Sequence, residues 1–171
     1  SDQDGGAGRL AGLRGGVTWD EFLAPAAPPD FEYAQMPADH PLLVMFSSGT
    51  TGKPKCMVQS AGGVLLNQLK ELVLHNDLAP GDRLLYITTC SWMMWNWQLA
   101  ALGTGAALVL YEGNPAYPGT DAIWKVVEDE QVTALGVSAS YIHSLMAQGF
   151  SPRQAADLTH LRMISQTGST L

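Results

Sequence analysis

The stretch of this sequence that is best equipped for chemistry is residues 47–55, Ser-Ser-Gly-Thr-Thr-Gly-Lys-Pro-Lys. Hydroxyl groups can donate hydrogen bonds to phosphate oxygens, and Lys53 and Lys55 add positive charge. Gly49 and Gly52 allow the backbone to approach a ligand closely. The pattern therefore predicts a loop that binds the phosphates of a nucleotide. The hydroxyl groups belong to Ser47, Ser48, Thr50 and Thr51.

Two alternatives explain this stretch less well. A Walker A loop, G-x-x-x-x-G-K-[ST], requires a glycine where Ser47 stands and a hydroxyl where Pro54 stands. Pro54 also lacks an N–H group, so a helix cannot begin through it as that loop requires. An ordinary solvated turn needs fewer donors and no pair of lysines. We therefore expect a phosphate loop of another kind.

The flanking residues predict the elements that position this loop. Residues 42–46 are a continuous apolar run, which is typical of a strand buried on both faces. Residues 61–75 carry apolar side chains at helical spacing. The loop is thus expected between a buried strand and a helix, a place where anions commonly bind.

The rest of the chain alternates between apolar runs and amphipathic segments. This alternation predicts an α/β fold with a mainly parallel sheet, helices on both faces and right-handed crossovers. We expect Thr120 to cap one helix and Gly149 to end another. Further strands are expected at 84–88, 106–111, 132–137 and 162–165. Further helices are expected at 90–102, 121–131, 140–148 and 152–158.

Residues 1–40 are rich in glycine and proline and predict a partly irregular flank or linker, with one helical turn at 17–23. Residues 41–171 would form the α/β portion of the domain. The chain stops directly after a strand, where a ligand site of an open α/β sheet would normally be completed. We therefore expect this domain to be truncated on its C-terminal side.

Composition excludes several classes of protein. The chain has 171 residues, of which 46% are hydrophobic, so it can bury a core. Its net charge is −7, which argues against nucleic acid and anionic membrane surfaces as partners. Residues 84–111 lack charge, but polar side chains and glycines interrupt them, which favours strand, helix and strand over a membrane span.

Cysteine and histidine usage points to a cytoplasmic protein without a metal centre. The two cysteines, Cys56 and Cys90, form neither a redox pair nor a metal knuckle, and we expect reduced, buried thiols. The four histidines show no zinc-binding spacing. No apolar segment of a signal peptide precedes residue 17.

Phe46 to Lys55 match the pattern aromatic-[ST]-S-G-T-T-G-x-P-K at every fixed position. This stretch resembles the signature loop of the adenylate-forming superfamily, which includes acyl-CoA synthetases, luciferases and the adenylation domains of peptide synthetases. The resemblance extends over about residues 30–171, which makes chance agreement of one motif a poor explanation. The segments at 39–42, 54–58, 60–63, 88–89, 92–97, 104–107 and 109–111 are similar to the acetoacetyl-CoA synthetase branch. Gln59 and Ser91 depart from the pattern of the wider superfamily, in which histidine and glycine are frequent at these positions.

The resemblance implies roles for these residues. The loop residues Ser47, Ser48, Gly49, Thr50, Thr51, Gly52 and Lys55 would bind the phosphates of ATP, with Lys53 as a supporting charge and Lys55 as the catalytic residue. Gly168, Ser169 and Thr170 would flank the adenine. An acid would attack the α-phosphate to give an acyl-adenylate and pyrophosphate, and coenzyme A would then displace AMP. Mg²⁺ is implied by the ATP chemistry.

The segment 92–97, Trp-Met-Met-Trp-Asn-Trp, has two interpretations. A helix that is apolar all round is typically buried in a core. The resemblance instead implies that Trp92 and Met93 line an acid or coenzyme A pocket, where Asn96 would orient a keto group.

The sequence thus predicts an ATP-dependent acid–CoA ligase that activates acetoacetate. One alternative is a truncated, non-catalytic nucleotide-binding module, and another is a different short-chain acyl-CoA synthetase. The predicted partners are small molecules, namely ATP, the acid and coenzyme A, and the sequence does not indicate an oligomeric state. We expect the 171 residues by themselves neither to adenylate an acid nor to form a thioester.

Overall fold

The computed structural model describes residues 14–23, 30–47 and 52–170, and the chain divides into two units, Ser1–Met36 and Pro37–Leu171. In the described part of the first unit, α2 (Trp19–Phe22) is a single helical turn. The helical turn expected at 17–23 is therefore confirmed. The rings of Phe31 and Tyr33 pack edge to face in the same unit, with centroids 5.1 Å apart.

The second unit is built on a parallel sheet. Among the described strands, its order is β4 (Ala107–Val109), β3 (Arg83–Tyr86), β5 (Ala134–Ser138) and β6 (Met163–Thr167). All three neighbouring pairs are parallel, and Leu84 lies between Leu108 and Ala134. The chain first moves from β3 to β4 and then crosses back to β5 and β6. This reversal leaves the carboxyl ends of β3 and β5 at the point where open α/β sheets bind ligands.

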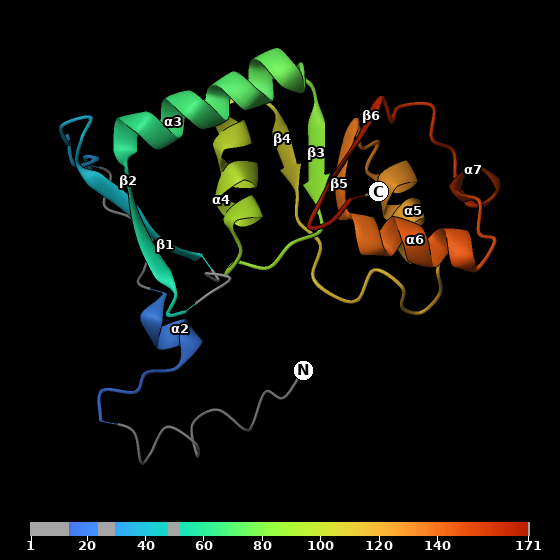
Figure 1. Ribbon diagram of the computed structural model, residues 1–171, viewed down its shortest axis with the longest axis horizontal. Coiled ribbons are helices and arrows are strands. Elements are labelled where there is room, and N and C mark those ends of the chain that lie inside the picture. Colours follow the sequence, from blue (N-terminus) through green and yellow to red (C-terminus); the bar gives the residue numbers. More distant parts are fainter. Residues whose placement is uncertain (1–13, 24–29, 48–51, 171) are drawn as a thin grey trace. The chain divides into compact units, whose positions relative to one another are not determined.

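Helices cover both faces of this sheet. One group is α3 (Ala61–Lys70), which continues as a π-helix through Glu71–His75, and α4 (Met93–Ala100), which continues as a 3₁₀ helix through Ala101–Thr104. The other group is α5 (Ala122–Asp129), α6 (Ala139–Ala147) and α7 (Pro152–Ala155). Figure 1 shows the two groups on opposite sides of the strands. The predicted fold class is confirmed.

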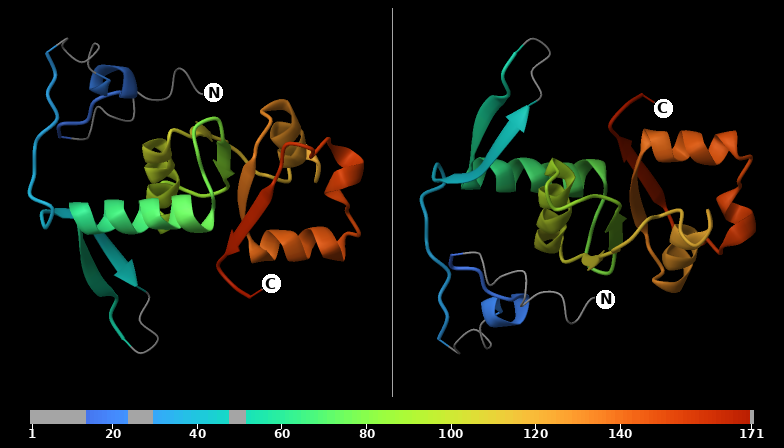
Figure 2. Two further views of the ribbon diagram at one scale, coloured as in Figure 1. Left: turned by 90° about the horizontal axis from the view of Figure 1, so that it is seen from above. Right: turned by 90° about the horizontal axis from the view of Figure 1, so that it is seen from below.

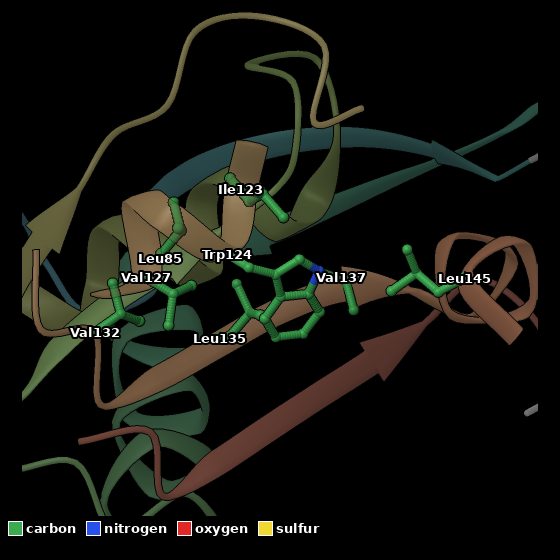
Figure 3. Packing of buried hydrophobic residues seen from close by; sticks show 8 residues of the cluster. All are labelled: Leu85, Ile123, Trp124, Val127, Val132, Leu135, Val137 and Leu145. Atoms are coloured by element: carbon green, nitrogen blue, oxygen red, sulfur yellow. The ribbon is translucent and has the colours of Figure 1, made fainter. Parts of the chain in front are cut away.

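Alternate side chains of the strands pack into two separate cores. Leu85, Leu135 and Val137 face α5 and α6, where Trp124 is buried among them (Figure 3). The neighbouring residues Leu84 and Ala134 point to the other face and pack against the α3–α4 group, on Leu72, Leu78 and Ala101. Because successive strand residues point to opposite faces, a strand buried on both sides has to be apolar throughout.

The ends of α5 and α6 are built differently from one another. The hydroxyl of Ser138 accepts a hydrogen bond from the Tyr141 N–H at the start of α6, and Gly149 follows its end with a φ of +64°. Gly149 therefore ends α6 as expected. The expected cap of α5 is wrong, because Asp121 occupies the N-cap position and the Thr120 hydroxyl donates to the side chain of Gln148 instead.

The first expected strand is present but differs from its prediction. β1 (Pro41–Ser47) pairs antiparallel with β2 (Lys55–Ser60) in a hairpin, outside the parallel sheet. Val44 and Phe46 are 57% and 67% exposed, so the strand is not buried on both faces. The loop at 48–54 therefore connects two strands and does not lead from a strand into a helix. Figure 2 shows the hairpin at the N-terminal end of α3.

A close contact between Tyr86 and Gly136 joins α4 to the sheet. The two residues are partners in the β3–β5 ladder, and a Cβ atom on Gly136 would lie 2.0 Å from the Tyr86 ring. The Tyr86 ring packs edge to face on Trp97 of α4, with centroids 5.8 Å apart. The Tyr86 N–H donates to the buried side-chain oxygen of Gln98, at 2.8 Å. Burial raises the pKa of Tyr86, so the phenol stays neutral.

Asp82 ties together the amino-terminal ends of three strands. Its carboxylate accepts hydrogen bonds from Thr133 at 2.7 Å, from Arg162 at 2.9 and 3.2 Å, and from the Ala79 N–H at 2.9 Å. Arg162 also donates to the Asp77 carbonyl at 2.6 Å. Partial burial pushes the pKa of Asp82 up, but these hydrogen bonds outweigh it and hold the pKa below its ordinary value.

We expect Gly136→Ala to lower the free energy of unfolding by about 1–3 kcal/mol, because the new methyl group must displace the Tyr86 ring. Urea denaturation followed by far-UV circular dichroism measures the change. Gly103→Ala is the matched control, since its Cβ would meet only the end of the flexible Leu69 side chain. Equal stabilities of the two variants would contradict the proposed contact.

We expect Asp82→Asn to cost about 2 kcal/mol at neutral pH, since it weakens charge-assisted hydrogen bonds. The pKa of Asp82 is lowered in the folded state. Its contribution is therefore complete above its unfolded pKa of about 4 and is lost as the pH falls through the folded pKa. Urea midpoints of wild type and variant should converge on acidification. Asp129→Asn, at an exposed position, should leave the midpoint unchanged; a gap that widens in acid would refute this assignment.

Candidate functional site

The predicted phosphate loop closes the β1–β2 hairpin. Ser47 and Lys55 are direct partners in the antiparallel ladder, so they stand opposite each other where the loop begins and ends. Ser48, Gly49, Thr50 and Thr51 lie outside the described residues. Gly52, Lys53, Pro54 and Lys55 are all exposed to solvent. This antiparallel pairing accounts for how the first and last residues of the motif come together.

The two lysines of this loop are available to bind an anion. The ion pairs found within the described ranges involve other cations and leave out Lys53 and Lys55. The whole chain carries 9 Lys and Arg residues against 16 Asp and Glu residues, so two lysines separated by one residue are a local exception. Unpaired ammonium groups on an exposed loop suit a phosphate ligand.

An open hollow lies between the hairpin and the segment that follows β3; we call it the hairpin hollow. Its volume is about 600 Å³, within the range of small-molecule sites. From the hairpin it is lined by Met45, Phe46, Ser47, Met57 and Gln59. From the segment after β3 it is lined by Thr89, Ser91, Trp92 and Met93. Met45 and Met57 are cross-strand partners, so both strands present side chains to this hollow.

Trp92 also links the hollow to the last described segment of the chain. Gly168 follows β6 with a φ of +100°, and a Cβ atom there would lie 3.9 Å from the tip of the Trp92 ring. Both residues follow the carboxyl ends of parallel strands, β3 and β6, and those ends meet at one edge of the sheet. Ser169 and Thr170 are exposed beside Gly168. The structure thus brings together Ser47, Trp92, Met93 and Gly168.

In the apolar segment 92–97, some side chains line the hairpin hollow and others pack in the core. Trp92 and Met93 are 49% and 44% exposed and line the hairpin hollow. Trp97 packs against the core formed with Leu72 and Leu84. The expectation of a helix buried on all sides is therefore wrong, because Leu99 and Leu102 in the later turns are also 39% and 58% exposed.

Asn96 does not line the hairpin hollow. Its side-chain N–H group lies 3.7 Å from the sulfur of Met45, a long and weak hydrogen bond. Gln59 supplies an amide side chain to the lining of the hollow, although it was not predicted as a site residue. Thr89 and Ser91 were not predicted as site residues either, and their hydroxyls lie 3.1 Å apart. The hydroxyl-rich stretch before Trp92 is the signal that could have indicated them.

The expectation of buried thiols is wrong. Cys56 and Cys90 are both free and exposed. Cys56 pairs with Phe46 on the open face of the hairpin, and Cys90 lies in the turn between β3 and α4. Because neither segment belongs to the parallel sheet, neither thiol enters a core.

Within the described ranges, no group of three or more His, Cys, Asp or Glu side chains is arranged to hold a metal ion. None of the helices described there is long and apolar enough to span a membrane. Residues 84–111 instead form β3, α4, the 3₁₀ turn and β4, as the sequence analysis expected.

Comparison with known proteins identifies the class of protein that this fold and site represent. The profile of the family described as AMP-binding enzyme matches residues 11–171. The chain belongs to this family. An acetoacetyl-CoA synthetase of Mus musculus is 48% identical over 158 residues, which are 91% of this chain and 24% of that protein. An acetoacetyl-coenzyme A synthetase of Rhizobium meliloti (strain 1021) is 45% identical and is covered to the same extent, 24%.

A solved structure supports the same relationship. The acetoacetyl-CoA synthetase from Streptomyces lividans superposes with a TM-score of 0.79 at 45% identity, over 89% of this chain and 23% of that one. The chain therefore spans about a quarter of the length of the relatives that it matches.

We expect both thiols to react with Ellman's reagent in the folded chain within minutes, because both are exposed. Replacing Cys56 with serine should leave one reactive thiol, and replacing Cys90 should leave the other. The absorbance early in the reaction, measured with and without denaturant, gives the number of reactive thiols. Thiols that react only after denaturation would contradict their placement here.

Proposed function

We propose that this chain supplies the triphosphate-binding loop and part of the acid site of an ATP-dependent acid–CoA ligase that activates acetoacetate. The observation that carries the proposal is the hairpin hollow. Ser47 at the base of the loop lines it together with Trp92 and Met93, and Gly168 lies against Trp92. A loop suited to phosphate and a wall suited to a small acid thus meet where an acyl-adenylate would form.

In this proposal the loop binds the β- and γ-phosphates of ATP while the acid attacks the α-phosphate. Ser47 and Lys55 face each other across the loop base, so a hydroxyl and an ammonium group approach the triphosphate together. The proposed ligands in the loop also include Ser48, Gly49, Thr50, Thr51 and Gly52, with Lys53 as a supporting charge. Their contribution is to position the phosphates and neutralise the charge that builds on departing pyrophosphate.

The acid would lie against Trp92 and Met93. The proposal of acetoacetate rests on relatives that are named for acetoacetyl-CoA and are up to 48% identical to this chain. A malonamoyl-CoA synthetase of Penicillium aethiopicum is 41% identical over 91% of the chain. An acid with a terminal amide therefore belongs among those to be tested. Gly168, Ser169 and Thr170 are proposed to flank the adenine.

Mg²⁺ and coenzyme A fit this site in different ways. Among the described residues, no group of three or more His, Cys, Asp or Glu side chains could hold a metal ion, so Mg²⁺ would be carried chiefly by the phosphates of ATP, with water completing its coordination. Coenzyme A would act as the second substrate and displace AMP. The hydroxyls and lysines of the loop would hold the triphosphate that carries Mg²⁺.

We also propose a cytoplasmic setting. Two exposed, free cysteines suit a reducing compartment, where thiols persist without pairing.

We expect Lys55→Ala to weaken ATP binding by about tenfold, because the ammonium group opposite Ser47 no longer neutralises phosphate charge. Isothermal titration of the chain with Mg-ATP measures the dissociation constant. Lys125→Ala is the matched control, since that lysine pairs with Asp121 on α5. Equal affinities of wild type and Lys55→Ala would refute the assignment of the loop.

The identity of the acid is tested by measuring pyrophosphate release with acetoacetate, acetate, propionate and malonamate. The assay uses the longest polypeptide that contains this chain. We expect the highest kcat/KM with acetoacetate. Since the chain spans about a quarter of its relatives, we expect no turnover from the 171 residues alone. Preference for acetate or propionate would overturn the proposed substrate, and ATP binding without release from any acid would favour a non-catalytic nucleotide-binding module.

A further inference from the structure

A second hollow lies on the other side of Met93; we call it the helix hollow. Its volume is about 610 Å³, and it is bounded by β2, α3 and the start of α4. Val64 of α3 and Met94 and Trp97 of α4 supply apolar walls. Asn67 and Gln68 of α3 supply amide groups, and Glu71 supplies a carboxylate. Figure 1 shows α4 below α3, with the hairpin to one side of α4.

The two hollows share part of their lining. Met93 and Gln59 line both, whereas Met45 and Met57 line only the hairpin hollow, and Met94 lines only the helix hollow. Met93 and Gln59 therefore stand where the two spaces adjoin. A ligand that extends from the hairpin hollow into the helix hollow would pass these two side chains.

We propose that Met93 and Gln59 select the acid substrate: the Gln59 amide binds the 3-oxo group, and the Met93 side chain closes the hairpin hollow toward the helix hollow. This inference rests on the proposed function and extends it to the class and length of the acid. Short 3-oxo acids would occupy the hairpin hollow alone. Longer linear 3-oxo acids would require Met93 to move and would place their tail in the helix hollow.

The chemistry of the two side chains supports this division of roles. No other group in the described part of the chain hydrogen-bonds the Gln59 side chain, so its N–H group is available to a carbonyl oxygen. Met93 is unbranched, has three rotatable side-chain bonds and is 44% exposed, so it can close a gap without being locked by its neighbours. Beyond it, the apolar walls of Val64 and Met94 suit an alkyl tail.

Methionine methyl groups provide a direct readout that needs no catalysis. With ¹³C-methyl-methionine, NMR titration of the chain with acetoacetate should shift Met45, Met57 and Met93 but not Met94. Met146, which is exposed on α6, reports nonspecific effects. In Met93→Ala, 3-oxooctanoate should also shift Met94, and it should bind about tenfold more tightly than it binds wild type.

Met93→Leu is the matched control because it nearly preserves side-chain volume, and it should retain the wild-type preference for acetoacetate. Gln59→Leu should bind 3-oxooctanoate no better than octanoate, whereas wild type should prefer the 3-oxo acid by about fivefold. The inference is overturned if Met94 stays unshifted in Met93→Ala, if Met93→Leu gains the long acid equally, or if Gln59→Leu keeps the preference.

These outcomes are separate from the test of the proposed function. If Mg-ATP binds in a Lys55-dependent manner while the long acid never shifts Met94, only the selection by Met93 fails. If ATP binding does not depend on Lys55, the proposed function fails whatever the methionine signals show.

Discussion

The position of the candidate site depends on the packing of Tyr86 against Gly136. The ring can lie there only because residue 136 has no Cβ atom, which would come within 2.0 Å of it. Trp97 then packs on Tyr86, and Gln98 binds the Tyr86 N–H, so α4 is attached to the β3–β5 pair through its middle. This attachment leaves the first turn of α4 at the carboxyl edge of the sheet and therefore sets where Trp92 and Met93 lie.

The hairpin contributes the other half of the site through its two unlike faces. Met45 and Ser47 are half-buried and line the hairpin hollow, whereas Val44 is exposed and does not line it. Phe46 is also exposed, but it borders the hollow. Period-two alternation of side chains thus distinguishes a half-buried row from a more exposed row within one short strand. The same strand ends at Ser47, at the base of the phosphate loop. The apolar wall that contains Met45 and the predicted anion-binding loop are therefore consecutive along the chain.

Sequence patterns indicated most elements of the parallel sheet because each pattern lies within a short stretch of the chain. Apolar runs bounded by turn residues correctly indicated β3, β4, β5 and β6, and amphipathic spacing indicated α5 and α6. The apolar run at 42–46 was correctly assigned as a strand but wrongly assigned as doubly buried. Runs of apolar residues look alike in a central strand and in a hairpin, because what covers the second face is a property of distant residues. β2 was missed for a related reason, since its pairing partner supplies most of the signal.

What the sequence determined by itself is the α/β class, the family relationship and the hydroxyl- and lysine-rich loop, since these depend on residue types and spacing along the chain. Only the tertiary structure decided that Ser47 lies opposite Lys55, that Trp92 meets Gly168 and that Gln59, not Asn96, lines the hairpin hollow. It also decided that Cys56 and Cys90 are exposed. Such relations arise from strand pairing and helix packing between separate segments of the chain, which no local pattern encodes.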